Sequence, residues 1–253
     1  MDTVLGRLCL VLALLAGCDV VFRLDELHDG GGGGGDINPV DDSITPDGPV
    51  DPRVLARFDF EGTMNEQKTG LPAECLGGSG CPGFKAGKHG MAIELDGNDD
   101  CLKFVLPSNP TQLTVTAWIN KFTDTGQSVV SKPYAATNSD TFQIDIEANQ
   151  NVRFITWNGT MDRILTQTNG IALNAWAHVA VTFDNNTYKR IYIDGGLVQT
   201  AIGETMVSDG SALLIGCDHE TSTYARYFAG RLDEIIVYNA ALGATEIASL
   251  ATP

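Results

Sequence analysis

The sequence of 253 residues predicts an all-β fold, an antiparallel two-sheet jelly-roll sandwich with one short C-terminal helix. From residue 54 onward apolar and polar residues alternate with a period of two, as in strands that are buried on one face. Turn-forming pairs such as Asp96-Gly97 and Asn158-Gly159 recur between the alternating runs. Many short strands separated by regular turn signals are typical of sandwiches and jelly rolls.

The alternating runs follow one another along this whole region. The expected strands cover residues 57–60, 92–96, 113–119, 142–147, 152–157, 176–183, 190–194, 212–215 and 231–238. In each run every second side chain lies on the same face, so one face can pack against the opposite sheet. The one good candidate for a helix is Ala244–Leu250, which follows the last expected strand.

The first 17 residues have the features of a secretory signal peptide: a basic start at Arg7, an apolar run over residues 8–15, and small residues after it. The run is too short to cross a bilayer core of ~30 Å. The ending Leu15-Ala16-Gly17-Cys18 resembles the lipobox of bacterial lipoproteins. The resemblance implies that Cys18 becomes the first mature residue and carries acyl chains, such as palmitate, that anchor the protein to a membrane. It also implies a place in the bacterial cell envelope, outside the cytoplasm. An ordinary signal peptide is the alternative.

Residues 18–53 are expected to form a disordered linker, because Gly30 to Gly35 run unbroken and an Asp- and Pro-rich stretch follows. The folded domain is then expected over residues 54–253. The formal net charge is −16, and no basic stripe is present. The composition therefore lacks the electrostatic footprint of a nucleic-acid-binding protein.

Four cysteines remain once the signal peptide and Cys18 are set aside: Cys75, Cys81, Cys101 and Cys217. An even number in an exported protein favours two disulfides, and four cysteines allow three pairings. We favour Cys75–Cys81, because a Gly-rich segment between them closes easily, which leaves Cys101–Cys217. A metal site is the alternative, although the spacing does not match the usual zinc patterns.

Several segments in the second half of the chain resemble one known family. They are the run Trp-Ala-His-Val-Ala-Val-Thr-Phe-Asp over 176–184, Tyr-Ile-Asp-Gly over 192–195, Leu-Ile-Gly over 214–216, and Phe-Ala-Gly-Arg-Leu-Asp-Glu-Ile-Ile-Val-Tyr over 228–238. Their order and spacing resemble the laminin-G-like, concanavalin A-like jelly roll. The resemblance implies a concave and a convex sheet in a non-catalytic domain of bacterial surface proteins.

The same resemblance implies a structural Ca²⁺ between the end of the first strand and the last strand. The family pattern corresponds here to the carbonyl of Gly62 and the carboxylate of Asp233, with Asp59 as a possible additional ligand. Calcium takes six to eight oxygen ligands, so these three would be an incomplete set. The alternative is that Asp233 accepts hydrogen bonds from a turn.

The strand 143–147 offers the strongest suggestion of catalysis. Gln143, Asp145 and Glu147 lie on one face, and the run resembles the Glu-x-Asp-x-Glu strand of family-16 glycoside hydrolases. Retaining hydrolysis needs two carboxyl groups, one as nucleophile and one as acid, and an amide at position 143 cannot be the nucleophile. We therefore expect a polar strand face and no catalytic residues.

The leading hypothesis is a binding module that recognises a glycan or a surface protein. The candidate ligand-binding residues are Trp157, at the end of an expected strand, and Tyr224 and Tyr227, in a polar segment expected to be a loop. The alternatives are a family-16-like hydrolase or lyase that uses the concave face, and a structural envelope or adhesion component. Fold alone does not decide among these classes.

Overall fold

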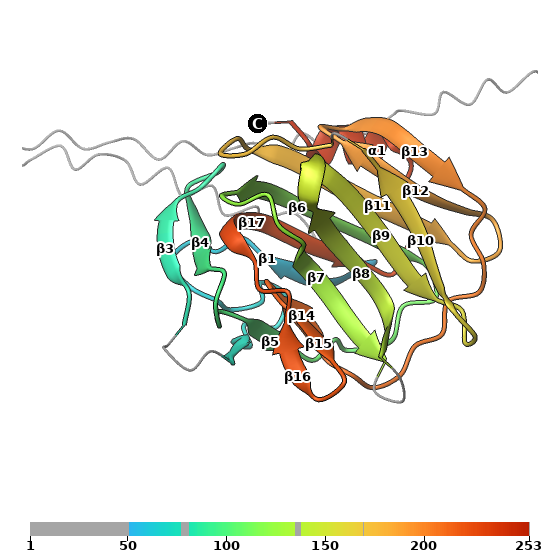
Figure 1. Ribbon diagram of the computed structural model, residues 1–253, viewed down its shortest axis with the longest axis horizontal. Helices are drawn as coiled ribbons and strands as arrows, with labels where there is room; N and C mark the ends of the chain where they lie inside the picture. Colours follow the sequence, from blue (N-terminus) through green and yellow to red (C-terminus); the bar gives the residue numbers. More distant parts are fainter. Residues whose placement is uncertain (1–50, 77–80, 135–137, 169, 253) are drawn as a thin grey trace, which may run out of the picture. The chain divides into compact units, whose positions relative to one another are not determined.

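A computed structural model describes residues 51–76, 81–134, 138–168 and 170–252, as two packed antiparallel sheets (Figure 1). The expected signal peptide over residues 1–17, Cys18 with its lipid anchor, and nearly all of the expected linker lie outside the described residues. In the described part of the chain, no helix is long and apolar enough to span a membrane.

The first sheet has eight strands in the order β13-β12-β11-β6-β17-β4-β3, and β1 also pairs with β17. Its strands are β1 (Val54–Phe58), β3 (Gly83–Ala86), β4 (Met91–Asp96), β6 (Leu113–Lys121), β11 (Ala177–Asp184), β12 (Tyr188–Ile193), β13 (Gly196–Ala201) and β17 (Ala229–Tyr238). The C-terminal strand β17 lies in the middle of this sheet, between β6 and β4.

The second sheet has seven strands in the order β10-β9-β8-β7-β14-β5-β2. Its strands are β2 (Glu74–Cys75), β5 (Leu102–Phe104), β7 (Gln127–Tyr134), β8 (Ser139–Glu147), β9 (Asn151–Trp157), β10 (Asp162–Gln167) and β14 (Leu213–Ile215). A 3-10 turn, Ala148–Gln150, links β8 to β9. A separate two-stranded hairpin of β15 (Asp218–Glu220) and β16 (Thr223–Ala225) follows β14.

The core lies between the two sheets, as the alternating pattern predicts. On β8 the side chains of Phe142, Ile144 and Ile146 belong to the main hydrophobic cluster, whereas Gln143 and Asp145 lie on the opposite face. A cluster of buried side chains that extends across both sheets removes a large apolar area from water, which is the main stabilising term in folding.

The structure confirms the predicted fold class, including the short C-terminal helix α1 (Ala244–Leu250). It also contains strands that the alternation did not indicate, of which β7 is the longest. Lys132 and Pro133 interrupt the apolar pattern of β7, yet Lys132 is buried and its Nζ donates to the Asp209 carbonyl oxygen at 2.7 Å. The segment 218–226, expected to be a loop, instead forms the β15–β16 hairpin.

Two disulfides are present in the structure, Cys75–Cys81 and Cys101–Cys217. The second joins residues 116 positions apart, with their Cα atoms 5.4 Å from each other. Cys101 directly precedes β5 and Cys217 directly precedes β15, so this bond fixes the start of the hairpin against the second sheet.

Candidate ligand-binding site

A pocket of about 240 Å³ opens where the β15–β16 hairpin meets the second sheet. Its walls come from five strands (β5, β7, β14, β15 and β16), the turn between β15 and β16, and the segment before β14. The lining residues are Lys103, Pro133, Tyr134, Ser211, Ala212, Leu214, His219, Thr221 and Tyr224. The antiparallel pairing of β14 with both β7 and β5 brings three of these strands side by side, and the hairpin supplies the other two.

Aromatic rings form much of the pocket wall. Tyr224 on β16 is 38% exposed, and its ring lies edge-on to His219 of β15 with the ring centroids 5.1 Å apart. Tyr134, at the end of β7, also lines the pocket, and the centroid of its ring lies 6.4 Å from that of Trp157. Aromatic faces next to polar groups bind flat, partly apolar ligands and orient them through hydrogen bonds.

The pocket has one lysine, and its charge is paired. Lys103 Nζ donates to Glu74 Oε2 at 2.9 Å, and this contact raises the pKa of Lys103. The hydroxyl groups of Ser211, Thr221 and the two tyrosines supply neutral donors and acceptors. The lining is therefore aromatic and hydroxyl-rich, with no unpaired lysine or arginine among its members.

The predicted binding residues occupy three different positions. Tyr224 lines the pocket, and Trp157 contacts the pocket residue Tyr134 without lining the cavity itself. Tyr227 packs instead against the small cluster that contains Cys101, Leu214 and Cys217. Sequence reasoning missed Tyr134, His219 and Lys103, since each lies in a strand that the alternation did not indicate and nothing in the sequence shows that these strands meet.

The strand face that suggested catalysis is occupied by ion pairs. Arg226 Nη2 lies 3.0 Å from Asp145 Oδ2 and 2.5 Å from Glu147 Oε1, and Arg153 Nη1 lies 2.6 Å from the same Glu147 oxygen. Burial raises the pKa of Asp145 to about 7, against the opposing effect of Arg226 and Arg153. Gln143 donates to the hydroxyl of Ser128 at 3.4 Å.

The predicted calcium ligands already have hydrogen-bond partners. Asp233 Oδ2 accepts from the backbone N–H groups of Lys88 and His89, and its Oδ1 accepts from the N–H of Glu234. Asp59 Oδ1 accepts from the side chain of Gln67 at 2.7 Å. A calcium ion at Gly62, Asp59 and Asp233 would compete with these donors, so its binding stays a prediction.

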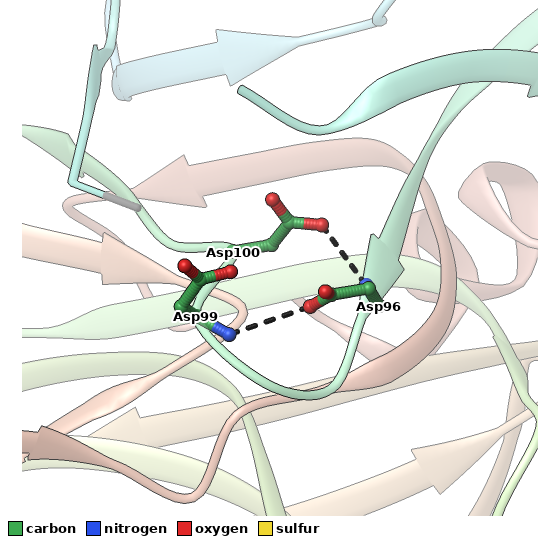
Figure 2. Close-up of side chains that lie close together, drawn as sticks. All are labelled: Asp96, Asp99 and Asp100. Carbon is green, nitrogen blue, oxygen red and sulfur yellow. Dashed lines mark hydrogen bonds between the residues drawn. The ribbon is translucent and has the colours of Figure 1, made fainter. Parts of the chain in front are cut away.

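A different acidic cluster lies in the turn after β4 (Figure 2), where carboxylate oxygens of Asp96, Asp99 and Asp100 are within 4.8 Å of one another. Two of the carboxylates stabilise the turn itself. Asp96 Oδ1 accepts from the Asp99 N–H at 3.3 Å, and Asp100 Oδ2 accepts from the Asp96 N–H at 2.9 Å. Such hydrogen bonds are typical of Asx turns and explain why aspartates gather here.

A laminin G family model, described as the concanavalin A-like lectin/glucanases superfamily, matches residues 96–248, which is more than half of the chain. The chain belongs to this superfamily. The match includes β5 to β17 and every pocket residue, and it confirms the resemblance seen in the sequence. A comparison with curated proteins finds no match.

Solved structures with the same superfamily fold include several binding domains. Domain 4 of AbnA, a GH43 extracellular arabinanase from Geobacillus stearothermophilus, in complex with arabinotriose, has a TM-score of 0.61 and 18% identity, over 79% of this chain and 98% of that one. The CBM40 of the Ruminococcus gnavus IT-sialidase, bound to α2,3-sialyllactose, has a TM-score of 0.54 and 17% identity, and the match covers 64% of this chain and 96% of that one. The binding domain of botulinum neurotoxin DC, in complex with SialylT, has a TM-score of 0.59 and 16% identity, and the match covers 78% of this chain and 50% of that one. At these identities the likeness establishes the fold alone.

Proposed function

We propose that this protein is a non-catalytic glycan-binding module that acts outside the cytoplasm. The observation that carries the proposal is the pocket between the hairpin and the second sheet, with Tyr134, His219 and Tyr224 around a cavity of about 240 Å³. This volume lies below the ~300–1,000 Å³ of pockets for drug-sized ligands, which suits one or two sugar rings at the end of a longer chain.

The chemistry of the lining supports a sugar more than an apolar ligand. A sugar ring has an apolar face that can pack on tyrosine and a rim of hydroxyl groups that need hydrogen-bond partners. Ser211, Thr221 and the tyrosine hydroxyls supply such partners at the same pocket. Two solved structures of this fold are complexes with glycans, arabinotriose in one and α2,3-sialyllactose in the other, which favours the same class of ligand here.

The chemistry of the β8 face argues against the hydrolase alternative. A retaining glycosidase needs a free nucleophilic carboxylate about 5–5.5 Å from its acid. Here position 143 is an amide, and the carboxylates of Asp145 and Glu147 are paired with Arg226. Release of reducing ends from β-glucans, agar, carrageenan or xylan by the purified protein would favour the enzyme instead.

We place the protein in the bacterial cell envelope, exported and lipid-anchored at Cys18. The lipobox-like sequence at residues 15–18 supports the anchor, and the two disulfides support an oxidising compartment, where such bonds form and persist. The proposed linker over residues 18–53 would hold the domain away from the membrane so that the pocket can reach a glycan.

The test is a glycan array probed with wild-type protein, followed by titration of the best glycan against two variants. We expect Tyr224→Ala to weaken binding at least about tenfold, because an aromatic wall is lost, which corresponds to about 1.4 kcal/mol. Phe122→Ala is the matched control, since Phe122 has the same 38% exposure and lies outside the pocket lining. Equal binding by wild type and Tyr224→Ala, or no glycan bound at all, would contradict the proposal.

A further inference from the structure

The hairpin that carries part of the aromatic wall forms no backbone ladder with either large sheet. Strands β15 and β16 pair only with each other, in a two-stranded sheet of their own (Figure 1). An isolated two-stranded hairpin is marginally stable in water. The positions of His219 and Tyr224 therefore depend on how the two ends of the hairpin are fixed.

The first end is fixed covalently. Cys217, which precedes β15, forms the disulfide with Cys101, and its carbonyl oxygen accepts a hydrogen bond from Ser131 Oγ at 3.1 Å. The carboxyl group of Asp218 is hydrogen-bonded to that of Asp140 on β8. These contacts attach the start of β15 to β5, β7 and β8.

The second end of the hairpin, after β16, has no disulfide and is held by contacts of Arg226. The Arg226 carbonyl oxygen accepts from the Ser128 N–H at 2.8 Å. Its guanidinium reaches across the outer face of the sheet, with Nη2 donating to both Asp145 and Glu147 on β8. The Asp145 side chain is only 2% exposed, so the ion pair is shielded from water far more than an ordinary surface pair.

Two backbone features are tied to the ion pairs of Arg226: the conformation of Arg226 itself and a glycine at position 126. Arg226 has φ +53°, a left-handed conformation that non-glycine residues adopt only when their surroundings enforce it. Gly126 lies beneath the ion pairs, and a Cβ atom there would be 2.8 Å from Glu147 Oε2. A side chain at position 126 would therefore displace the carboxylate that holds Arg226.

We infer that Arg226 is a positioning residue of the ligand pocket, held by Asp145 and Glu147 so that the β15–β16 hairpin keeps His219 and Tyr224 in place. This inference rests on the proposed binding function and deepens it. The polar face of β8, which resembles a hydrolase strand, then has a role without catalysis: its two carboxylates anchor the binding wall. Loss of the guanidinium leaves the C-terminal end of the hairpin with the backbone hydrogen bond from Ser128 but without its ion pairs to β8, while the disulfide still holds the other end.

The experiment compares Arg226→Met with Arg231→Met in the full chain. Arg231 is a matched control, because its side chain is 28% exposed against 24% for Arg226, and it pairs with Glu94 on β4, away from the hairpin. The first readout is amide hydrogen exchange, which needs no ligand. We expect peptides covering 218–226 to exchange at least about tenfold faster in Arg226→Met, with peptides from β6 and β17 unchanged.

The second readout is affinity for the best glycan from the array, which should fall in Arg226→Met and not in Arg231→Met. If Arg226→Met does not fold, Glu147→Gln gives the same comparison, since it weakens one of the two ion pairs and keeps an acceptor. Hairpin exchange that is unchanged, or equally fast in Arg231→Met, would overturn the inference even if glycan binding is confirmed. Faster hairpin exchange in a protein that binds no glycan would support the anchoring role and contradict only the proposed function.

Discussion

Asp233 offers the sharpest test of how the last strand stabilises the domain. Its side chain is fully buried, and its carboxylate accepts three backbone hydrogen bonds, at 2.8 Å from Lys88, 3.0 Å from His89 and 2.9 Å from Glu234. The first two donors belong to the turn between β3 and β4, so Asp233 connects that turn to the central strand β17. Replacing Asp233 with alanine leaves all three N–H groups without this acceptor.

Two opposing contributions determine how much Asp233→Ala changes the free energy of unfolding. Hydrogen bonds to a charged group contribute about 1.5–3 kcal/mol each, and an unsatisfied buried donor costs about 1–3 kcal/mol. Against this, burial raises the pKa of Asp233 to about 7, so the ionised carboxylate is costly to bury. The turn amides of Lys88 and His89 can also reach water in the variant. We therefore expect Asp233→Ala to lower the free energy of unfolding by about 2–4 kcal/mol.

The assay is urea unfolding followed by tryptophan fluorescence, carried out once with EGTA and once with added Ca²⁺. If the lost hydrogen bonds cause the destabilisation, Asp233→Ala lowers the free energy of unfolding by the same amount in both buffers. Asp59→Ala serves as the control and should lose less than about 1 kcal/mol, because its partners lie at the surface. A variant as stable as wild type in EGTA, and weaker only in Ca²⁺, would refute this reasoning and identify Asp233 as a calcium ligand.

Two further predictions concern a titrating group and the anchor. Burial and the neighbouring Asp218 raise the pKa of Asp140, so this group makes the fold less stable as pH rises above its unfolded value of ~3.9. In urea unfolding, the free energy of unfolding should fall less in Asp140→Asn than in wild type when the pH is raised from about 5 to about 8. An equal fall in both proteins would contradict this prediction. Cys18→Ala should be released from the membrane or left unprocessed, while the intact mass of the wild type should include acyl chains. Membrane retention of a normally processed Cys18→Ala protein would exclude the anchor.

The fold class could be predicted because burial on one face leaves a direct trace in the sequence. The run 142–147 alternates cleanly, since one face meets the core and the other meets polar groups. Strand β7 was missed because its buried Lys132 looks like a surface residue until the acceptor at Asp209 is known. Edge strand β13 was missed for the opposite reason, because Leu197 and Val198 are apolar yet exposed.

The pocket could be predicted only in part. Tyr224 was a candidate because it lies in a polar segment expected to be a loop, where binding residues on a β scaffold usually sit. Tyr134 and His219 also line the pocket, but they come from β7 and β15, which do not pair and are brought together by tertiary contacts such as the Cys101–Cys217 disulfide and the hydrogen bond from Ser131 to the Cys217 carbonyl oxygen. Tyr227 looked equivalent to Tyr224 in the sequence, but in the structure it is partly buried against the cluster that contains both cysteines of the Cys101–Cys217 disulfide. Long-range contacts of this kind leave no local pattern.

The β8 strand shows how one sequence pattern can serve two kinds of chemistry. Carboxylates at alternate positions of a strand share a face, and their negative charge has to be balanced when that face is partly buried. A retaining hydrolase keeps one carboxyl group protonated as the acid and the other ionised as the nucleophile, which faces the positive charge that develops on the substrate in the transition state. Here Arg226, which lies 81 positions after Asp145, supplies the balancing charge from within the chain. The carboxylates and their spacing can be seen in the sequence, but the residue that pairs with them decides whether the face is catalytic or anchors the hairpin. Because tertiary folding brings Arg226 to Asp145, no local pattern in the sequence distinguishes these two roles.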